Sequence, residues 1–574
     1  MSLNIIVAMS QNKLISIGRV IGPGEDSSSI RIQSKDNLHS RIGEFLIYEI
    51  NKKFVFLVVS NRSLKKSLPD YYMAQVELSA EDIAETLGIE NSLEDIEYEL
   101  TASILGYFDE NLNALVNPRI NPEPNTLVFL APDEELEKIL FLKKQNEIGS
   151  AEIGELLLRN NIKAFIDMDE MISTHFSILA GTGSGKSYLA RVIIEEFMKP
   201  QNRASICIFD PHGEYSTFSD DYKGISVLKD FRQNSYSAKT KVLIPGYNLK
   251  IKISDLRESE LKPLLFNLTE KMEHELFNVL KRARKKANKR NSQEWTYKDF
   301  TEALEDLELE NEEEIKQNKQ NNTGTLDAIK WRFEKRFGQK NNKTNLFSDT
   351  EGTVLRDIFE VGQCTIIDLS RIEEEEQQVL SSVIISKAYE ALVRNQNNEV
   401  ESNGFENSLD HPVLILLEEA HRFAPVGQRD KISNSVLRKV LAEGRKFGIG
   451  VGLITQRPGK LDQDVLSQCM TQFLMRLINP LDQESVKQGV ESAGRDLLRE
   501  LPSLSKGQCI VCGSAVRTPV MLKIRKALTP HGGESKKASA IYFEKTSEVV
   551  IDGKKARKAS FKTTEEDRDL WELE

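Results

Sequence analysis

The sequence predicts an α/β protein whose core is a mostly parallel sheet, with a small β-barrel before the core and a helical insertion inside it. Apolar strand segments alternate with helical patterns between residues 172 and 524. Short β segments separated by turn residues occupy residues 14–130. Residues 255–346 interrupt the core with a helical, highly charged pattern. Together these three observations define the fold class.

Length and composition set the number of domains. A chain of 574 residues with 39% hydrophobic residues is long enough for several globular domains. We divide it into a β-barrel module, the first part of the core, a charged helical insertion, the second part of the core, and a C-terminal tail or inter-subunit strap. These units span residues 1–132, 133–254, 255–349, 350–526 and 527–574.

Charge and hydropathy exclude two classes of protein. The net charge of −11 shows that the chain is not coated with basic groups for nucleic acid, so any DNA binding must be local, as in a lined channel. No apolar run approaches the ~20 residues of a membrane span. We expect no membrane association and a cytoplasmic location.

The N-terminal region reads as a small β-barrel. Turn-rich stretches such as GPGEDSSS separate its expected strands. No cluster of catalytic residue types occurs there, which favours a role in assembly or docking. The expected strands are residues 14–17, 30–32, 45–50, 54–59, 74–78, 100–105 and 127–130, and residues 131–174 are expected to connect the barrel to the core.

A phosphate-binding loop is predicted at residues 180–187, which match the pattern [AG]-x4-G-K-[ST]. An apolar strand segment, 176–179, precedes the loop, and a helix is expected to begin at Lys186. Glycines allow backbone N–H groups to face phosphate oxygens, and the helix dipole favours the same negative charge. We expect Lys186 to contact the β and γ phosphates of ATP and Ser187 to ligate Mg²⁺. The candidate nucleotide-binding residues are Gly181, Thr182, Gly183, Ser184, Gly185, Lys186, Ser187 and Tyr188.

Carboxylates at strand ends are the candidate catalytic groups. The apolar run 413–417 ends in Glu418 and Glu419, which are costly to bury unless metal or water satisfies them. We expect Glu418 to lie toward Mg²⁺ and Glu419 to polarise the attacking water. Asp210 and Glu214 follow the strand 204–209, which comes directly after the P-loop helix. They either join the site or serve only to form a turn.

The remaining core elements alternate in type. We expect strands at residues 364–369, 413–417, 450–455, 472–477, 508–512 and 520–524, and helices at 374–394, 434–447 and 464–469. Cys509 and Cys512 form a CxxC inside a strand-like run; buried core cysteines explain it better than a zinc site, since no second ligand pair is present.

Two charged stretches lie in the insertion. Residues 281–290, KRARKKANKR, carry seven positive charges in ten, and residues 305–314 are acidic. The basic stretch is either a solvated helical face or a contact for DNA or a partner. The acidic stretch is expected to be a solvated face or linker, and residues 318–323 a flexible connection.

Several motifs after LAGTGSGKS resemble those of the HerA ATPases, relatives of the FtsK translocases. They are DPHGEY, LLEEAHRFAP, LAEGRKFGIGVGLITQRPGKLD and VLSQCMTQFLMRL. The resemblance covers residues 172–524 apart from the insertion, and IGRVIG at 17–22 resembles the HerA barrel module. It implies a RecA-like P-loop core in a homo-oligomer, expected to be a hexamer, that encircles double-stranded DNA with ATP between subunits. It also implies a partner, either a NurA-like nuclease or a nuclease or sirtuin-like effector of antiviral defence.

The resemblance extends the candidate site. It places Gln456 as the γ-phosphate sensor and supports Arg445 as a finger that reaches the γ-phosphate of a neighbouring subunit; without the resemblance, a surface salt bridge is the alternative for Arg445. Thr174 occupies a place where family members often have arginine, so a second, cis-acting cation would have to come from Arg457 or another basic residue.

The leading functional hypothesis is a DNA-translocating ATPase or helicase. The alternative is an ATPase scaffold that assembles and regulates a partner effector with little DNA translocation. A protein-export ATPase of the conjugation type shares the core, and the lack of a membrane segment disfavours it.

Overall fold

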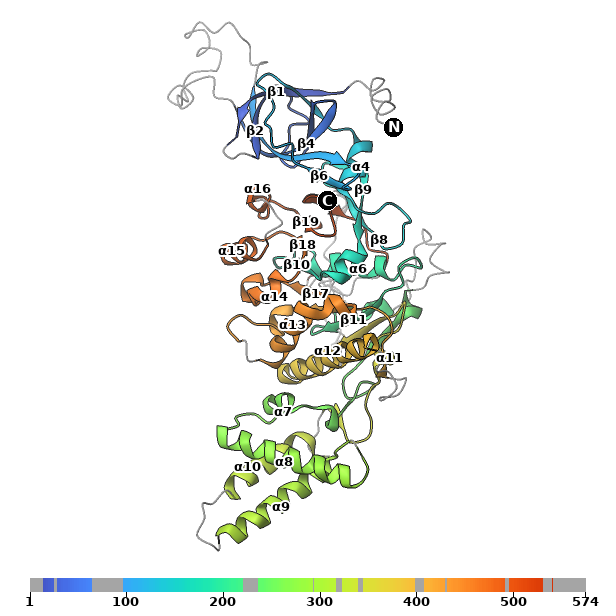
Figure 1. Ribbon diagram of the computed structural model, residues 1–574, viewed down its shortest axis with the longest axis vertical. Helices are drawn as coiled ribbons and strands as arrows, with labels where there is room; N and C mark the ends of the chain where they lie inside the picture. The colour runs from blue at the N-terminus through green and yellow to red at the C-terminus, as the bar shows by residue number, and fades with distance from the viewer. Residues whose placement is uncertain are drawn as a thin grey trace, which may run out of the picture. The chain divides into compact units, whose positions relative to one another are not determined.

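The computed structural model describes residues 14–24, 28–64, 97–219, 236–292, 294–315, 323–338, 344–397, 407–428, 431–490, 495–529 and 539. The chain divides into two compact units, residues 1–530 and 531–574. All elements described below belong to the first unit (Figure 1). No helix in the described ranges is both long and apolar enough to cross a bilayer.

The N-terminal strands form a closed barrel, as predicted. The 7-stranded sheet has the order β2-β1-β7-β3-β4-β5-β6, and an additional pairing of β2 with β5 closes it. Its core contains Leu46, Tyr48, Val55 and Leu57, all fully buried. The strands are β1 (Ser16–Pro23), β2 (Ser29–Ser34), β3 (Phe45–Ile50), β4 (Lys53–Leu64), β5 (Tyr98–Asp109), β6 (Ala114–Val116) and β7 (Leu127–Leu130). The expected strand at 74–78 lies outside the described residues.

The core is an 11-stranded sheet in the order β12-β15-β11-β16-β17-β10-β18-β19-β20-β8-β9. Neighbours from β12 to β18 are parallel, and those from β18 to β9 are antiparallel. The parallel strands are β12 (Thr240–Leu243), β15 (Cys364–Asp368), β11 (Ser205–Asp210), β16 (Val413–Glu418), β17 (Ile449–Thr455), β10 (Phe176–Leu179) and β18 (Thr471–Leu474). The others are β19 (Gln508–Gly513), β20 (Val520–Ile524), β8 (Ser150–Leu156) and β9 (Arg159–Asp167).

Helices cover both faces of the core sheet, which explains its almost uniformly apolar strands. Every residue of β10, β11 and β16 is buried. Along β11, Ile206 and Ile208 pack in the same cluster as α6 (Lys186–Phe197), whereas Cys207 and Phe209 pack with α12 (Glu374–Gln396) and α13 (Ile432–Glu443). The core is therefore a three-layer α/β/α arrangement. The smaller helices are α11 (Leu355–Ile358), α14 (Gln463–Ser467), α15 (Pro480–Gly489) and α16 (Arg495–Arg499).

The segment expected to be a connector belongs largely to the core. Residues 131–174 contain α4 (Asp133–Leu140), the β8–β9 hairpin and α5 (Met168–Ser173). The hairpin joins the core sheet through β20. The prediction missed it because the two residues of its turn, 157 and 158, are leucines rather than the glycine, proline or asparagine that usually mark a hairpin. Cys509 and Cys512 are buried in β19, as core cysteines.

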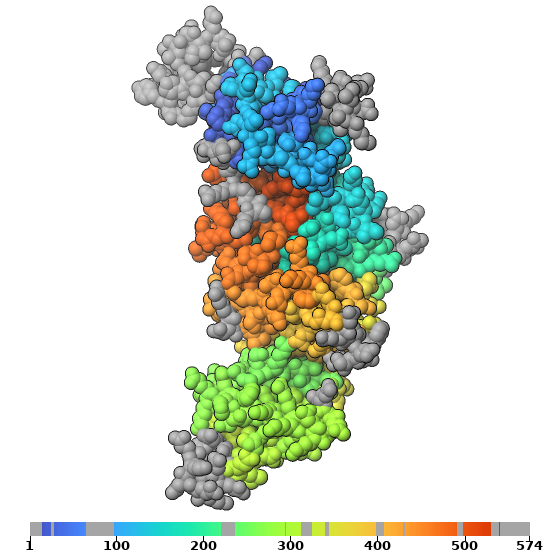
Figure 2. Space-filling model, viewed as in Figure 1, coloured from blue at the N-terminus to red at the C-terminus, as the bar shows by residue number. Residues whose placement is uncertain are grey.

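The insertion is a helical bundle that leaves and re-enters the core through a short parallel pair, β13 (Ile251–Lys252) and β14 (Phe347–Ser348). Its helices are α7 (Glu258–Leu264), α8 (Glu270–Lys289), α9 (Tyr297–Ile315) and α10 (Thr323–Phe337). Stacked rings of Phe300 and Phe333, with centroids 3.7 Å apart, occupy its interior. The insertion is green in the space-filling view of Figure 2.

The two charged stretches of the insertion pair with each other along one side of α8. Arg282 forms a two-pronged ion pair with Glu310, and Lys286 lies 3.0 Å from Asp306. Arg290 pairs with Asp299, which lies before the acidic stretch in α9. The acidic stretch is thus a structural partner of the basic one rather than a linker. The other side of α8 presents an exposed basic row made of Lys281, Arg284, Lys285 and Lys289.

Candidate nucleotide site

The loop between β10 and α6 has the geometry of an anion cradle. Gly183 and Gly185 have φ of 76° and 102°, a left-handed conformation that glycine adopts without strain. Gly181 anchors the loop by donating its N–H to the Arg476 carbonyl at 2.8 Å. Within the described chain, the N–H groups of Gly183, Gly185 and Lys186 donate to no protein acceptor. These free donors, at the positive end of α6, suit phosphate oxygens.

Lys186 extends from the first residue of α6 to two carboxylates. Its side chain is 4% exposed; the ammonium pairs with Glu418 and lies 3.5 Å from Oε1 of Glu419. Burial lowers the pKa of Lys186, and the Glu419 and Glu214 carboxylates oppose that shift. The ammonium is therefore held inside a desolvated acidic pocket, where its charge interacts strongly with any further anion.

The acidic pair lies at the carboxyl end of β16, as predicted. Glu418 is fully buried and accepts a hydrogen bond from the Tyr215 hydroxyl at 2.8 Å. Glu419 follows it with φ of 52°, a left-handed conformation that is costly for a residue with a side chain. Its Oε2 lies 3.3 Å from Nδ1 of His421 and 3.5 Å from the Gln456 backbone N–H. Both glutamates contact Lys186, but their other partners differ: Tyr215 for Glu418, and His421 with the Gln456 backbone for Glu419.

Asp210 and Glu214, at the end of β11 and in the turn that follows it, have different roles. Asp210 uses both carboxylate oxygens to accept N–H groups of the following turn, from Gly213 at 2.9 Å and Tyr215 at 2.9 Å. Burial raises the pKa of Asp210, and these hydrogen bonds oppose the rise. Asp210 thus shapes the turn. Glu214, which the turn presents, accepts a hydrogen bond from the Ser187 hydroxyl at 2.6 Å.

Gln456 lies at the same edge of the sheet as the P-loop. It directly follows β17, the parallel neighbour of both β10 and β16. Its side-chain oxygen accepts a hydrogen bond from the Thr182 hydroxyl at 3.0 Å. The parallel register therefore brings together residues from four separate motifs.

Arg445 lies at the opposite edge of the sheet. It is exposed in a 3-10 turn, Gly444–Phe447, directly before β17, whereas the P-loop meets the far end of that strand. The rise of ~3.3 Å per residue along β17 separates the two edges by about 20 Å, more than an arginine side chain spans. Arg445 makes no ion pair with a described residue of this chain.

Sequence reasoning missed three contributors to this site. Tyr215, the last residue of DPHGEY, follows the neighbouring strand β11 and donates its hydroxyl to Glu418. His421 lies between Glu419 and the Thr455 hydroxyl, and its Nδ1 is 2.9 Å from the oxygen of that hydroxyl. Burial lowers the pKa of His421, and the Glu419 carboxylate opposes that shift. Arg476, exposed after β18, holds the P-loop through its carbonyl. Tyr215 and His421 belong to the motifs that carry the resemblance, so that signal could have found them.

The two positions considered for a cis-acting arginine lie in different surroundings. Thr174 is buried, and its hydroxyl donates to the Glu170 carbonyl. Arg457 is exposed beyond β17.

The donor set fits a magnesium–triphosphate. Free N–H groups and the Lys186 ammonium supply phosphate donors, and the Ser187 hydroxyl with nearby Glu418 and Glu214 supplies hard oxygen ligands directly or through water. The described residues contain no group of three or more histidine, cysteine, aspartate or glutamate side chains that could hold a metal by themselves. A hydroxyl and carboxylates beside a phosphate loop are typical of Mg²⁺ that is bound together with phosphates.

A family model and two curated relatives that are similar to this chain share the name HerA. The family described as "Helicase HerA, central domain" matches residues 151–388. The chain is 28% identical over 488 residues to the DNA double-strand break repair helicase HerA of Pyrococcus furiosus, covering 78% of this chain and 80% of that protein. It is 25% identical over 514 residues to the protein of the same name from Saccharolobus solfataricus, covering 88% and 92%. Among solved structures, VirB4 of Thermoanaerobacter pseudethanolicus superposes with a TM-score of 0.48 and 15% identity, covering 67% of this chain and 99% of VirB4.

Proposed function

We propose that this chain is a member of the HerA family of helicases, an ATP hydrolase that works as a ring-shaped motor and moves along or unwinds double-stranded DNA. The observation that carries the proposal is that the phosphate loop and the acidic pair of one chain meet at one edge of the core sheet. Lys186, Glu418 and Glu419 meet there within one buried cluster. The curated HerA relatives are named as DNA double-strand break repair helicases.

Each residue of the cluster has a chemical role in this proposal. The P-loop N–H groups and Lys186 bind the β and γ phosphates, and Ser187 and Glu418 hold Mg²⁺, which neutralises phosphate charge when bound. Glu419 accepts a proton from the attacking water, and its backbone turn keeps it separate from Glu418. Gln456, linked to Thr182 of the loop, senses the γ-phosphate. Glu214 orients the Ser187 hydroxyl.

The position of Arg445 supports a site shared between subunits. Because Arg445 lies about 20 Å from its own P-loop, it cannot act on the nucleotide bound there. An exposed arginine with no ion-pair partner in the described chain is free to reach a neighbour's γ-phosphate. A closed homo-oligomer, which we expect to be a hexamer, would repeat this contact at every interface.

The acidic net charge restricts where DNA can bind. With a net charge of −11, the outer surface as a whole repels phosphate, so binding must depend on local basic groups. A channel through the ring is the natural location. We further propose that the motor works with a partner, a NurA-like nuclease in DNA end processing or a nuclease or sirtuin-like effector in antiviral defence.

ATP hydrolysis with and without linear duplex DNA tests the proposal. We expect DNA to stimulate turnover, and the stimulation to weaken steeply as salt rises, because neutralised phosphates release counterions. Glu419→Gln serves as the control that binds nucleotide without turnover. Hydrolysis that ignores DNA and depends instead on a partner protein would favour the scaffold alternative and overturn the motor.

A further inference from the structure

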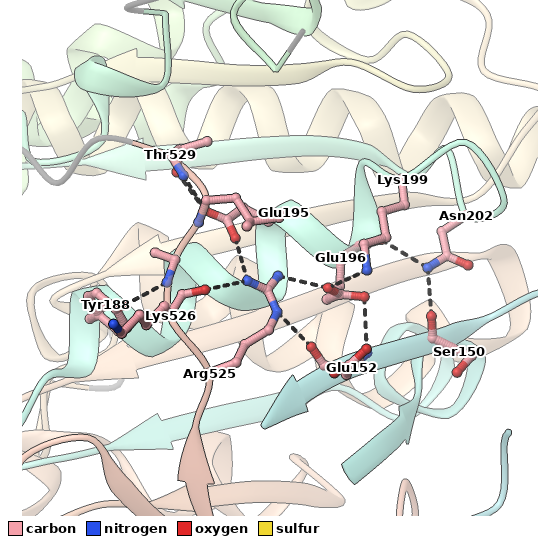
Figure 3. A network of polar contacts seen from close by, with 12 residues as sticks. Ser150, Glu152, Tyr188, Glu195, Glu196, Lys199, Asn202, Arg525, Lys526 and Thr529 are labelled. Atoms are coloured by element: carbon pink, nitrogen blue, oxygen red, sulfur yellow. Dashed lines mark hydrogen bonds and ion pairs between the residues drawn. The ribbon is translucent and has the colours of Figure 1, made fainter. Parts of the chain in front are cut away.

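Residues 525–529, which follow the last core strand, run along the P-loop helix α6 and are tied to it by a buried polar network (Figure 3). The Arg525 guanidinium donates to Glu195 at 2.9 Å and to Glu196 at 2.7 Å. Both glutamates are essentially inaccessible to solvent. The Ala527 N–H donates to the Tyr188 hydroxyl at 2.6 Å. The segment therefore fastens to one stripe of α6.

Glu195 is the centre of this attachment. Its Oε1 accepts the N–H groups of Leu528 and Thr529, each at 2.8 Å, and the Thr529 hydroxyl at 2.7 Å. A buried carboxylate with this many donors is strongly satisfied, so the segment has one preferred position on the helix. Thr529 is thereby placed beside Arg191, one turn closer to the P-loop.

Arg191 connects Thr529 to the nucleotide site. One of its nitrogens donates to the Thr529 hydroxyl at 3.3 Å, and another donates to the Glu214 carbonyl at 3.1 Å and the Thr217 hydroxyl at 3.0 Å. The guanidinium lies 4.4 Å from the centre of the Phe218 ring, and the side chain is buried. The side chain of Glu214, in turn, accepts the Ser187 hydroxyl.

We propose that residues 525–529 act as a C-terminal clamp in which Thr529 positions Arg191, and Arg191 positions Glu214 against the magnesium-side serine, Ser187. This inference rests on the proposed function, because it assigns Ser187 to bound Mg²⁺. Thr529 and Arg191 touch neither nucleotide nor metal in this proposal and are positioning residues.

A pair of nearly isosteric variants tests the clamp in the full-length chain. Thr529→Val removes one of the acceptors of Arg191, while the backbone N–H groups of residues 528 and 529 still hold Glu195; Thr529→Ser keeps the hydroxyl. The readout is equilibrium binding of a fluorescent, non-hydrolysable ATP analogue, titrated with Mg²⁺ and repeated in EDTA.

Thr529→Val loses two charge-assisted hydrogen bonds, one accepted from Arg191 and one donated to Glu195. We expect the loss of the first, which leads to Glu214, to raise the Mg²⁺ concentration for half-maximal binding about three- to tenfold. Its affinity in EDTA should be unchanged, and Thr529→Ser should match the unaltered chain. Arg191→Lys, which keeps the charge but loses the planar fork, should raise the Mg²⁺ requirement further. Equal Mg²⁺ requirements for the valine and serine variants would overturn the clamp.

Hydrogen exchange separates failure of the clamp from failure of the proposed function. In the nucleotide-free chain, Thr529→Val should speed amide exchange in residues 213–219, and the serine variant should not. If the unaltered chain binds no nucleotide but this difference appears, the nucleotide assignment fails and the clamp's effect on Glu214 stands. If nucleotide binds and exchange is the same in all variants, the clamp is wrong and the nucleotide site stands.

Discussion

Arg445 provides the sharpest test of a site shared between subunits. Its turn and the P-loop occupy opposite ends of β17, about 20 Å apart, so one chain cannot supply both to the same nucleotide. Arginine fingers contribute roughly 10³–10⁵ in rate in other phosphoryl-transfer systems. We therefore expect Arg445→Ala to bind ATP and assemble, yet to hydrolyse ATP at about a thousandth of the normal rate or less.

Mixing two inactive variants measures the sharing directly. Arg445→Ala subunits keep a good P-loop, and Lys186→Ala subunits keep a good finger. In randomly mixed rings at equal amounts, half of the P-loops are intact and half of their neighbours carry a finger. About a quarter of the interfaces are then complete, and steady-state ATPase assays should recover up to about a quarter of normal activity.

Two controls make the result decisive. Arg445→Ala mixed with the double variant Lys186→Ala/Arg445→Ala contains no finger at all and should recover nothing. Lys446→Ala changes a neighbouring exposed cation in the same turn and should hydrolyse ATP normally. No recovery in rings shown to be mixed would refute the shared-site reasoning.

Four more variants test other parts of the molecule. Lys186→Ala should weaken ATP binding about 10- to 100-fold by equilibrium titration, since the phosphates lose a charged donor; unchanged affinity would remove Lys186 from the site. Glu419→Gln should bind ATP normally and slow turnover at least ~100-fold, and near-normal turnover would assign the base elsewhere. Burial lowers the pKa of His175 from 6.5 to about 4, so the unfolded chain binds the proton first as pH falls. The contribution of neutral His175 to the free energy of unfolding is therefore complete above pH 6.5, and about 3 kcal/mol of it is lost as the pH falls to 4. The thermal midpoint of His175→Gln should fall less steeply over this pH range. An equal fall in the variant and the unaltered chain would contradict the buried, neutral state of His175. Neutralising the exposed basic row of α8 should weaken duplex-DNA binding and flatten its salt dependence if DNA passes there, whereas a change in partner binding or solubility alone would make the row a docking or solvent face. The matched control neutralises the paired Arg282 and Lys286.

Local sequence was sufficient for most of the core. A strand buried on both faces must be apolar along its whole length, so β10, β11 and β16 stood out. The glycine-rich loop before Lys186 indicated the phosphate cradle for a similar reason, because its backbone conformation restricts the residue type. The β8–β9 hairpin was not predicted, because its turn contains none of the residue types that usually mark a hairpin turn.

Long-range pairing could not be read from the chain. A charged stretch has the same sequence pattern whether it is solvated or paired with an opposite charge. Only the packing of α8 against α9 joins Arg282 of the basic stretch to Glu310 of the acidic stretch. The contact of the C-terminal segment with α6 spans more than 300 residues of sequence, and no motif marks Thr529 as a partner of Arg191.

The sequence by itself determined the chemistry of this protein: a phosphate loop, an acidic strand end and the motifs of a known ATPase family, all encoded in short stretches where one backbone geometry demands particular residues. The tertiary structure alone decided which of these groups meet. It placed Glu214 on Ser187, left Asp210 to shape a turn, and set Arg445 at the far edge of the sheet. The reason is physical, since the order and parallel direction of strands fix which side chains share an edge, and that order arises from packing across the whole chain.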